Sequence, residues 1–327
     1  MRRRTFIEGI AALAAVRPSA AGAQQSAMRV VGFLSSRAPD DSVNIVTAFK
    51  LGLKETGFTE GQNLRIEYRW AEGKLDLLPS LAADLAQQKV AVIFATGSTL
   101  PALAAKATTA TIPIVFTGGE DPVRIGLVDS LDRPGGNATG VVNIAATLDG
   151  KRVELLRELA PKAAALAYLV DPNNPNVESE TTVKETARSL GQEYYVLRAG
   201  SEADLDAAFA TIPQRPASML LVQSDPFFLG RARAQIIALA AQYAVPASYG
   251  FREFTSAGGL MSYGANIAEL ARQAAIYTGR ILKGEKPAEL PVMQPTKFDL
   301  VINLKTAKAL GLDVPLFLQQ RADEVIE

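Results

Sequence analysis

The chain has 327 residues, 48% hydrophobic and 21% charged, enough to bury one large core or two medium ones in a globular protein. Lys plus Arg and Asp plus Glu both number 34, so the net charge is zero, and no nucleic acid or acidic membrane is expected as a partner. The chain has no His and no Cys, which excludes Ser-His-Asp and Cys-His nucleophile pairs, the usual zinc sites and thiolate redox centres.

The chemistry left to this composition is acid-base work by carboxylates, Lys or Tyr, an oxygen-ligated magnesium or calcium site, or binding without reaction. The carboxylates show no spacing that forces two of them together, so glycosidase-type catalysis has no support. We therefore assign no catalytic residue and no metal ligand, and expect no cofactor.

The first residues have the features of an export signal. A basic start at residues 1–4 precedes an apolar run at 10–16, and Ala21-Gly22-Ala23 is a small-residue cleavage site. The apolar run is much shorter than the roughly 20 residues of a membrane-spanning helix. The paired arginines resemble a twin-arginine signal, with an ordinary Sec signal as the alternative. The sequence predicts a signal peptide over 1–23 and a periplasmic mature chain, with no lipid anchor because no Cys follows the cleavage site.

From Met28 onward, short apolar runs alternate with helical periodicity, which is typical of strand-helix-strand units and a mostly parallel sheet. Predicted strands in the first half cover 29–34, 64–70, 90–95, 112–116 and 139–143. Predicted helices there cover 42–56 and 75–88, and another opens after the loop at 96–99. In the second half, predicted helices cover 147–159, 176–190, 202–211, 230–243 and 266–283. Predicted strands there cover 165–170, 194–197, 219–222, 247–249, 259–263 and 298–302.

This pattern predicts an α/β fold of two doubly wound, Rossmann-like lobes with parallel sheets and a ligand cleft between them. No Gly/Ser-rich or Pro-rich linker separates the halves, so we expect plain crossing strands near 141–145 and 263–266. The first lobe is predicted to comprise 28–142 plus about 264–292. The second is predicted to comprise about 143–263 plus 293–327.

The loops that follow the predicted strands are small and polar. In open parallel sheets, ligands bind outside the carboxyl ends of the strands, where backbone N–H groups and helix N-termini are available. Two facing sheets would bring these loops to one cleft. The loops lie at 35–37, 96–99, 117–122, 171–176 and 223–228.

The loop Thr96-Gly97-Ser98 has the form of a phosphate-binding turn before a helix. It lacks both the Walker lysine and the G-x-G-x-x-G spacing with a following acidic residue. A small ligand's carboxylate or hydroxyl is therefore the favoured partner. The alternative is that Ser98 simply caps the helix.

Three predicted strands end at Asp-Pro, namely Asp121-Pro122, Asp171-Pro172 and Asp225-Pro226. Asp at the N-cap followed by Pro is typical of a helix start, so a capping role is expected for at least two of them. Asp225 is the exception, because Phe227 follows it and would place apolar surface beside a carboxylate that binds an ammonium group. The alternative places the phenylalanines in the core. Tyr263, at the expected crossing, is predicted to be a hinge or pocket-wall residue.

Several segments resemble the ABC transporter substrate-binding protein family. They include "GFLSSR", "IPIVFTGGEDPV", "LDRPGGNATG", "DPNNPN" and the block "GRILKGEKPAELPVMQPTKFDLVINLKTAKALGL", and the resemblance covers essentially the whole mature chain. It implies a type I periplasmic-binding-protein fold whose two lobes close on a solute for delivery to a membrane permease. The better understood relatives bind aromatic amino acids such as tryptophan.

The family's binding loops match this chain at Ser35, Ser36, Thr96, Gly97, Ser98, Gly118, Gly119, Asn143, Asn173, Asn174, Asp225 and Tyr249. Arg37, Phe227 and Tyr263 complete the predicted ligand-binding set. Arg37 and the run Asp225-Pro226-Phe227-Phe228 depart from the tryptophan-binding branch. The ligand therefore stays open, because an acidic or aromatic acid would suit Arg37 and an amino acid would suit Asp225.

Taken together, the residues and the resemblance predict a monomeric periplasmic binding component of an ABC importer that is not an enzyme. Its solute would be an amino acid, an aromatic compound or a carboxylate, and its partner an ABC permease. Two alternatives are a periplasmic sensor subunit for a membrane receptor and an enzyme that works without His or Cys in the same cleft. A DNA-binding regulator is disfavoured by the signal peptide.

Overall fold

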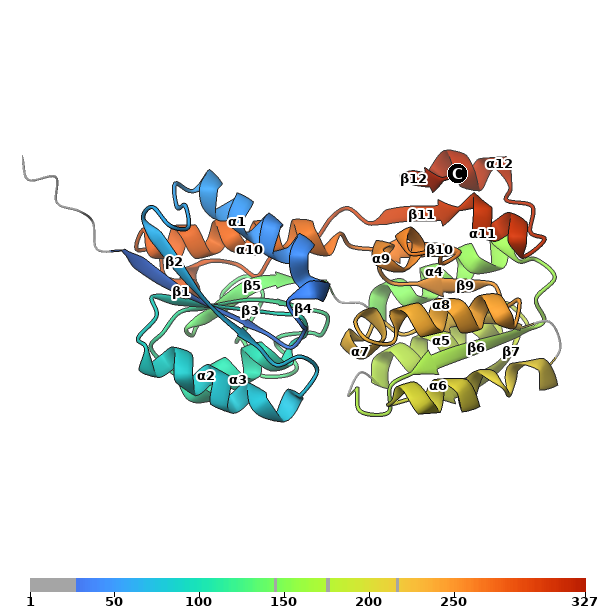
Figure 1. Ribbon diagram of the computed structural model, residues 1–327, viewed down its shortest axis with the longest axis horizontal. Coiled ribbons are helices and arrows are strands. Elements are labelled where there is room, and N and C mark those ends of the chain that lie inside the picture. The colour runs from blue at the N-terminus through green and yellow to red at the C-terminus, as the bar shows by residue number, and fades with distance from the viewer. Residues whose placement is uncertain (1–27, 144–145, 175–176, 216–217) are drawn as a thin grey trace, which may run out of the picture.

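The computed structural model describes residues 28–143, 146–174, 177–215 and 218–327. These residues form two α/β lobes arranged along the long axis of the molecule (Figure 1), which confirms the predicted fold class. The predicted signal peptide and its cleavage site lie outside the described residues. Among the residues described, no helix has the length and apolar character needed to cross a membrane.

The first lobe contains a five-stranded, all-parallel sheet in the order β2-β1-β3-β4-β5. Its strands are β1 (Arg29–Ser35), β2 (Leu64–Trp70), β3 (Val92–Thr96), β4 (Ile114–Gly118) and β5 (Ala138–Val142). One face is covered by α1 (Val43–Glu55) and α10 (Ile267–Leu282), and the other by α2 (Leu78–Gln87) and α3 (Leu100–Thr108) (Figure 1). Between α1 and the sheet, the rings of Phe49 and Phe94 stack at 4.3 Å in an apolar core.

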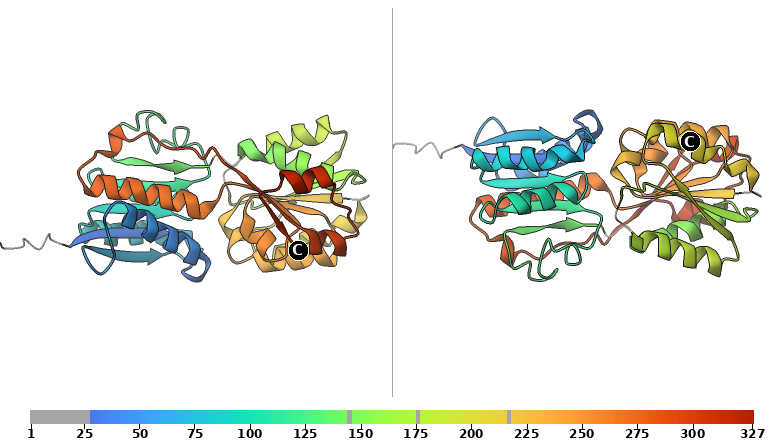
Figure 2. Two further views of the ribbon diagram at one scale, coloured as in Figure 1. Left: turned by 90° about the horizontal axis from the view of Figure 1, so that it is seen from above. Right: turned by 90° about the horizontal axis from the view of Figure 1, so that it is seen from below.

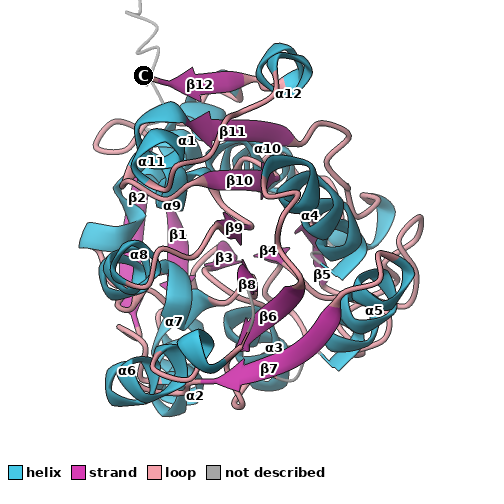
Figure 3. Cartoon of the chain, turned by 90° about the vertical axis from the view of Figure 1, so that its right-hand side faces the viewer, coloured by secondary structure: helices cyan, strands magenta, loops and turns pink. Residues whose placement is uncertain are grey.

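The second lobe contains a seven-stranded sheet in the order β12-β11-β10-β9-β8-β6-β7, which Figure 3 shows from the end of the molecule. Its strands are β6 (Ala165–Val170), β7 (Glu193–Arg198), β8 (Ser218–Val222), β9 (Ala247–Tyr249), β10 (Met261–Gly264), β11 (Asp299–Asn303) and β12 (Glu324–Ile326). Only the β10-β11 pair is antiparallel. Its helices are α4 (Ala146–Leu159), α5 (Val177–Ser189), α6 (Glu202–Phe209), α7 (Pro226–Leu229), α8 (Arg233–Gln242), α9 (Arg252–Ser256), α11 (Leu304–Ala309) and α12 (Leu316–Arg321).

All the helices and strands predicted from periodicity are present, with bounds that differ by a few residues. The sequence pattern does not reveal α7, α9, α11, α12 and β12, which are three to six residues long. Such segments are too short to show a helical or strand period, so hydrophobic patterning cannot identify them.

Helix α10 follows β10 of the second lobe but packs against α1 of the first, as the two views in Figure 2 show. The backbones of the two helices approach very closely. A Cβ added to Gly52 would lie 2.2 Å from the carbonyl oxygen of Arg272, and one added to Gly279 would lie 1.9 Å from Thr56 Oγ1. Only glycine fits at these two contacts, so α10 is joined tightly to the first lobe.

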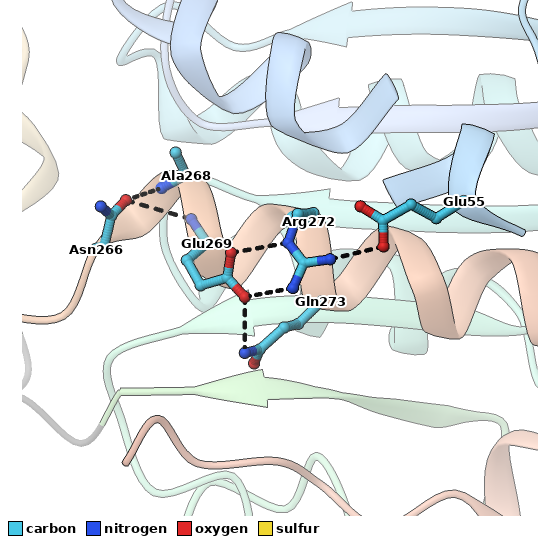
Figure 4. Close-up of polar contacts among 6 residues, drawn as sticks. All are labelled: Glu55, Asn266, Ala268, Glu269, Arg272 and Gln273. Carbon is cyan, nitrogen blue, oxygen red and sulfur yellow. Dashed lines mark hydrogen bonds and ion pairs between the residues drawn. The ribbon is translucent and has the colours of Figure 1, made fainter. Parts of the chain in front are cut away.

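Polar contacts fix the start of α10 just after the crossing strand (Figure 4). Asn266 Oδ1 caps the helix by accepting from the backbone N–H groups of Ala268 and Glu269. Arg272 donates to both carboxylate oxygens of Glu269, and its Nη1 donates to Glu55 Oε2 of α1 at 2.7 Å. These contacts raise the pKa of Arg272, chiefly through the hydrogen bonds to Glu269.

The return of the chain to the second lobe begins after Met293. The prediction placed this residue in the second lobe, but its backbone N–H donates to Gly140 of β5, and its carbonyl accepts from Val142. Hydrogen bonding along β5 therefore keeps Met293 with the first lobe, a pairing that no local pattern indicates.

The close contact at Gly52 predicts that Gly52→Ala destabilises the chain. The added Cβ would force α1 and α10 apart, since the atom it meets is backbone. We expect the free energy of unfolding to fall by about 1 to 3 kcal/mol, measured by denaturant unfolding. Asn44→Ala on the exposed face of α1 is the matched control and should change stability by less than about 0.5 kcal/mol. Equal stability of the two variants would contradict the role of the contact.

Candidate functional site

A cleft of about 800 Å³ lies where the two lobes meet. The loops after all five strands, β1 to β5, line it from the first lobe, and those after β6, β7, β8 and β9 line it from the second. The first turns of α10 add Ile267 and Leu270. In both sheets these loops follow the carboxyl ends of parallel strands, the usual position of ligand sites in open α/β sheets.

The first-lobe wall is built by close approach of the loops after β1 and β3. Gly97 has a φ of +93°, and a Cβ there would lie 2.6 Å from Ser36 Oγ. The backbone N–H of Ser36 donates to the Thr96 carbonyl at 3.3 Å. The hydroxyls of Thr96 in β3 and Thr117 in β4 lie 2.7 Å apart and connect the ends of these two strands. Glycine is required at position 97 by both its backbone angle and its neighbours.

Three buried polar atoms on this wall have no hydrogen-bond partner among the described residues: Ser36 Oγ, Arg37 Nε and Ser98 Oγ. All three residues line the cleft. Arg37 is 5% exposed, and burial lowers the pKa of its guanidinium despite the nearby carboxylates of Glu253 and Asp41. A buried donor without an acceptor costs about 1 to 3 kcal/mol, so this wall is suited to an anionic or carbonyl group.

The second-lobe wall presents Asp225, which is 5% exposed. Its Oδ1 accepts from the backbone N–H groups of Phe227 and Phe228, and its Oδ2 accepts from Asn174 Nδ2 at 2.8 Å. Burial, with the nearby charge of Asp171, raises the pKa of Asp225 to about 6 even though these hydrogen bonds oppose the shift. The carboxylate therefore caps α7 and faces the cleft at once.

All three Asp-Pro aspartates accept hydrogen bonds from backbone N–H groups two or three residues later. Asp121 accepts from Val123 and Arg124, and Asp171 accepts from Asn173. The expectation that Asp225 would be the exception to the capping role is wrong, because Asp225 caps α7 in the same way. Asp225 differs from the other two aspartates because it is buried and because its second oxygen accepts from Asn174.

The rest of the lining divides into apolar and charged side chains. The large apolar ones are Ile45, Leu75, Leu100, Phe227, Leu229, Phe251, Ile267 and Leu270. Seven carboxylates and three cations line the same cleft, so it carries an excess of negative charge although the whole chain is neutral. The carboxylates are Asp41, Glu72, Asp76, Glu120, Asp171, Glu202 and Asp225, and the cations are Arg37, Lys74 and Arg231.

Twelve of the fifteen predicted ligand-binding residues line the cleft. They are Ser36, Arg37, Thr96, Gly97, Ser98, Gly118, Gly119, Asn143, Asn173, Asn174, Asp225 and Phe227. The other three, Ser35, Tyr249 and Tyr263, do not. Ser35 is fully buried at the end of β1, where its hydroxyl accepts from the backbone N–H of Arg37.

The two tyrosines lie elsewhere because of the faces that their strands present. Tyr249 points into the core of the second lobe, where its ring stacks on Phe254 at 4.4 Å, and burial raises the pKa of its hydroxyl. Tyr263 pairs with Leu300 of β11 and packs near Phe298. Phe251, two residues after Tyr249, lines the cleft instead.

The loop at 72–76 after β2 supplies five lining residues that the sequence did not indicate. This loop is fixed to the first wall by the Gly73 N–H, which donates to the Ser36 carbonyl at 2.8 Å. Arg231 and Phe251 were also not predicted. The positive φ of Glu72 and the charge run Glu72-Gly73-Lys74 mark the loop as a tight turn, but do not show which loops it meets.

Within the described residues, no three carboxylates come together in a group that could hold a metal ion. The geometry is that of a binding cleft between two lobes, and the family comparison agrees. The family model described as "ABC transporter substrate binding protein" matches residues 29–326. The chain belongs to this family. It is therefore a substrate-binding protein and not an enzyme, as predicted.

Individual relatives support the assignment. This substrate-binding protein is 26% identical over 271 residues to a "Tyrosine-binding protein" from Clostridioides difficile, covering 81% of this chain and 75% of the relative. A crystal structure of a conserved domain protein from Vibrio cholerae matches with a TM-score of 0.84 and 27% identity over 91% of this chain and 99% of that one. A Streptococcus pneumonia domain solved in complex with L-Trp matches with a TM-score of 0.82, 22% identity and the same coverage, and so shows the shared fold.

The raised pKa of Asp225 predicts a pH-dependent stability for the substrate-binding protein without solute. Between about pH 4 and 6 the folded chain holds this proton more tightly than the unfolded chain, so stability falls as pH rises through that window. Relative to Asp225→Asn, the free energy of unfolding should fall by about 3 kcal/mol between pH 4 and 7.

Denaturant unfolding across this pH range measures the difference between the two proteins. Asp204→Asn is the control, because hydrogen bonds from Ser201 and then Gly200 lower the pKa of the exposed Asp204. Its effect should be small and opposite in sign. A pH-independent difference between wild type and Asp225→Asn would contradict the buried, proton-retaining carboxyl.

Proposed function

We propose that this chain is the periplasmic substrate-binding component of an ABC importer, and that its solute is an α-amino acid with an apolar, aromatic side chain. The observation that carries the proposal is the pairing of opposite walls in one cleft. Unpartnered buried donors lie on the first lobe, and a buried carboxylate lies on the second. The printed names of two relatives, a tyrosine-binding protein and a complex with L-Trp, support the solute class.

The first-lobe wall is suited to the carboxylate of the solute. Ser36 and Ser98 offer hydroxyls, Arg37 offers Nε–H, and the loop before α3 adds backbone N–H groups at a helix N-terminus. A carboxylate has enough lone pairs to accept from all of these donors at once. Hydrogen bonds to a charged group contribute about 1.5 to 3 kcal/mol each, and here they also remove the cost of unpartnered donors.

The second-lobe wall is suited to the ammonium group. Asp225 lines the cleft, where its Oδ2 accepts from Asn174 and lies close to the charge of Asp171. The excess of carboxylates around the cleft attracts cations and opposes solutes that carry only negative charge. A solute with both charges satisfies Arg37 and Asp225 together, which a simple acid does not.

The size and apolar lining of the cleft accommodate the remainder of such a solute. A volume of about 800 Å³ lies in the range of small-molecule sites, about 300 to 1,000 Å³. Phe227 and Phe251 offer ring surfaces from the second lobe, and Ile267 and Leu270 offer aliphatic surface from α10. An aromatic side chain would bury its apolar area against these groups.

Closure of the lobes would complete the function. Each wall carries only part of the site, so a solute bound to both walls favours the arrangement in which they approach. The rims already come near one another, since a Cβ on Gly230 would lie 3.4 Å from Asp41 Oδ2. In this proposal the signal peptide directs export, the mature chain is a monomer, and the permease recognises the closed form.

A solute panel tests the proposal. L-Tyrosine and L-tryptophan should raise the melting temperature of residues 24–327 and bind at one site, as measured by thermal shift and calorimetry. Tyramine lacks the carboxylate and 3-(4-hydroxyphenyl)propionate lacks the ammonium group, so each should bind about tenfold or more weakly than tyrosine. Solution scattering should show a more compact chain with tyrosine bound. Absence of binding and of compaction across a broad amino-acid panel would refute the proposal.

The charged groups can be tested one at a time. Arg37→Gln should weaken L-tyrosine binding by about tenfold, because it removes a charge-assisted hydrogen bond to the carboxylate. The same variant should leave tyramine binding unchanged. Arg65→Gln, at an exposed arginine of β2 outside the cleft, is the matched control and should have little effect on either ligand. Equal loss of both ligands in Arg37→Gln would indicate a structural role for Arg37 and not a carboxylate contact.

A further inference from the structure

A buried ion pair lies behind the second-lobe wall of the cleft. Asp149 and Arg152 occupy positions i and i+3 of α4, which packs against β8, β9 and β10, and the two side chains form a direct ion pair. They are 0% and 1% exposed. This burial lowers the pKa of Arg152 to about 10. Neither residue lines the cleft.

The pair contacts a side chain within β6 and the ends of β8 and β9. Asp149 Oδ2 accepts from the Tyr168 hydroxyl of β6 at 3.3 Å, and Arg152 Nη1 donates to the carbonyl of Val222, the last residue of β8, at 3.3 Å. Gly250 directly follows β9, and a Cβ there would lie 2.9 Å from Arg152 Nη1 and 2.1 Å from Ser224 Oγ. The guanidinium thus fills the space that a side chain at position 250 would need.

Each of these strands leads into a loop that lines the cleft. Asp171 follows β6, Ser224 and Asp225 follow β8, and Phe251 follows β9. Three loops of the second wall therefore follow strands that the ion pair contacts. The loop after β7 is the second-lobe loop that lacks a described contact with the pair.

Stability alone does not account for this arrangement. Removing two charges from water costs several kcal/mol, and apolar replacement of a buried pair is often neutral or stabilising. Arg152 also keeps a buried Nε with no hydrogen-bond partner among the described residues. We propose that Arg152, held by Asp149, is a positioning residue for solute binding that sets the spacing of the loops after β6, β8 and β9. The inference relies on the proposed function only in taking the cleft as the solute site.

Paired apolar substitution separates positioning from stability. Arg152→Met alone leaves Asp149 as an unpaired buried charge and should lower the melting temperature strongly. The double variant Asp149→Leu/Arg152→Met removes both charges and should recover a melting temperature within a few degrees of wild type. Its dissociation constant for L-tyrosine or L-tryptophan should still rise by about tenfold, because the anchor at the Val222 carbonyl is lost. Lys151→Met/Glu154→Leu is the matched control, an exposed i, i+3 pair on the same helix.

Hydrogen exchange supplies a measurement that needs no solute. In the double variant the amides of 222–225 and 250–252 should exchange faster than in wild type, while those of β7 and α6 should not change. Arg152→Lys keeps the charge but lacks the planar guanidinium group with its several N–H donors. It should show the same faster amide exchange at 222–225 and 250–252, with a stability close to that of wild type. Gly250→Ala should displace Ser224 and weaken binding with Arg152 intact.

Wild-type affinity and wild-type exchange in a stable double variant, or in Arg152→Lys, would overturn the inference. If the wild type binds none of the solutes, the proposed function fails. The exchange rates still decide whether Arg152 positions the loops.

Discussion

The close packing of α10 on α1 determines how the chain connects the two lobes. At Gly52 and Gly279 the helices approach so closely that no side chain fits between them, and Arg272 adds a contact with Glu55 at the end of the same interface. A helix that follows β10 of the second lobe is thereby part of the first. The chain must then cross between the lobes three times, after β5, after β10 and before β11.

The cleft that results is built for binding more than for reaction. It contains no His, no Cys and no described metal group, and its buried polar atoms are donors on one wall and a carboxylate on the other. Burial without a partner is costly for the donors of the first wall, whereas both oxygens of Asp225 already accept hydrogen bonds. In the proposed function, the solute supplies the partners that the first wall lacks and contacts the Asp225 carboxylate on the second.

Asp225 shows how one residue serves structure and site together. Its first oxygen caps α7, so the Asp-Pro pattern correctly indicates a helix start, and its second oxygen remains beside Asn174 at the cleft. The ion pair of Asp149 and Arg152 contacts Tyr168 of β6 and the Val222 carbonyl at the end of β8, just before this loop. Neither residue of the pair lines the cleft.

The two α/β lobes, the order of the longer helices and strands, the family and most of the cleft loops can all be predicted from the sequence. These follow from local periodicity and from the rule that loops at the carboxyl ends of parallel strands carry the site. The remaining features of the cleft and of the lobe connection depend on tertiary contacts. It directed Tyr249 into the core and Phe251 to the cleft, brought the 72–76 loop against Ser36, kept Met293 with β5 and buried Arg152 behind Ser224. Each of these depends on which distant strands and helices meet, and a contact between residues far apart in the chain leaves no periodic signal near either of them.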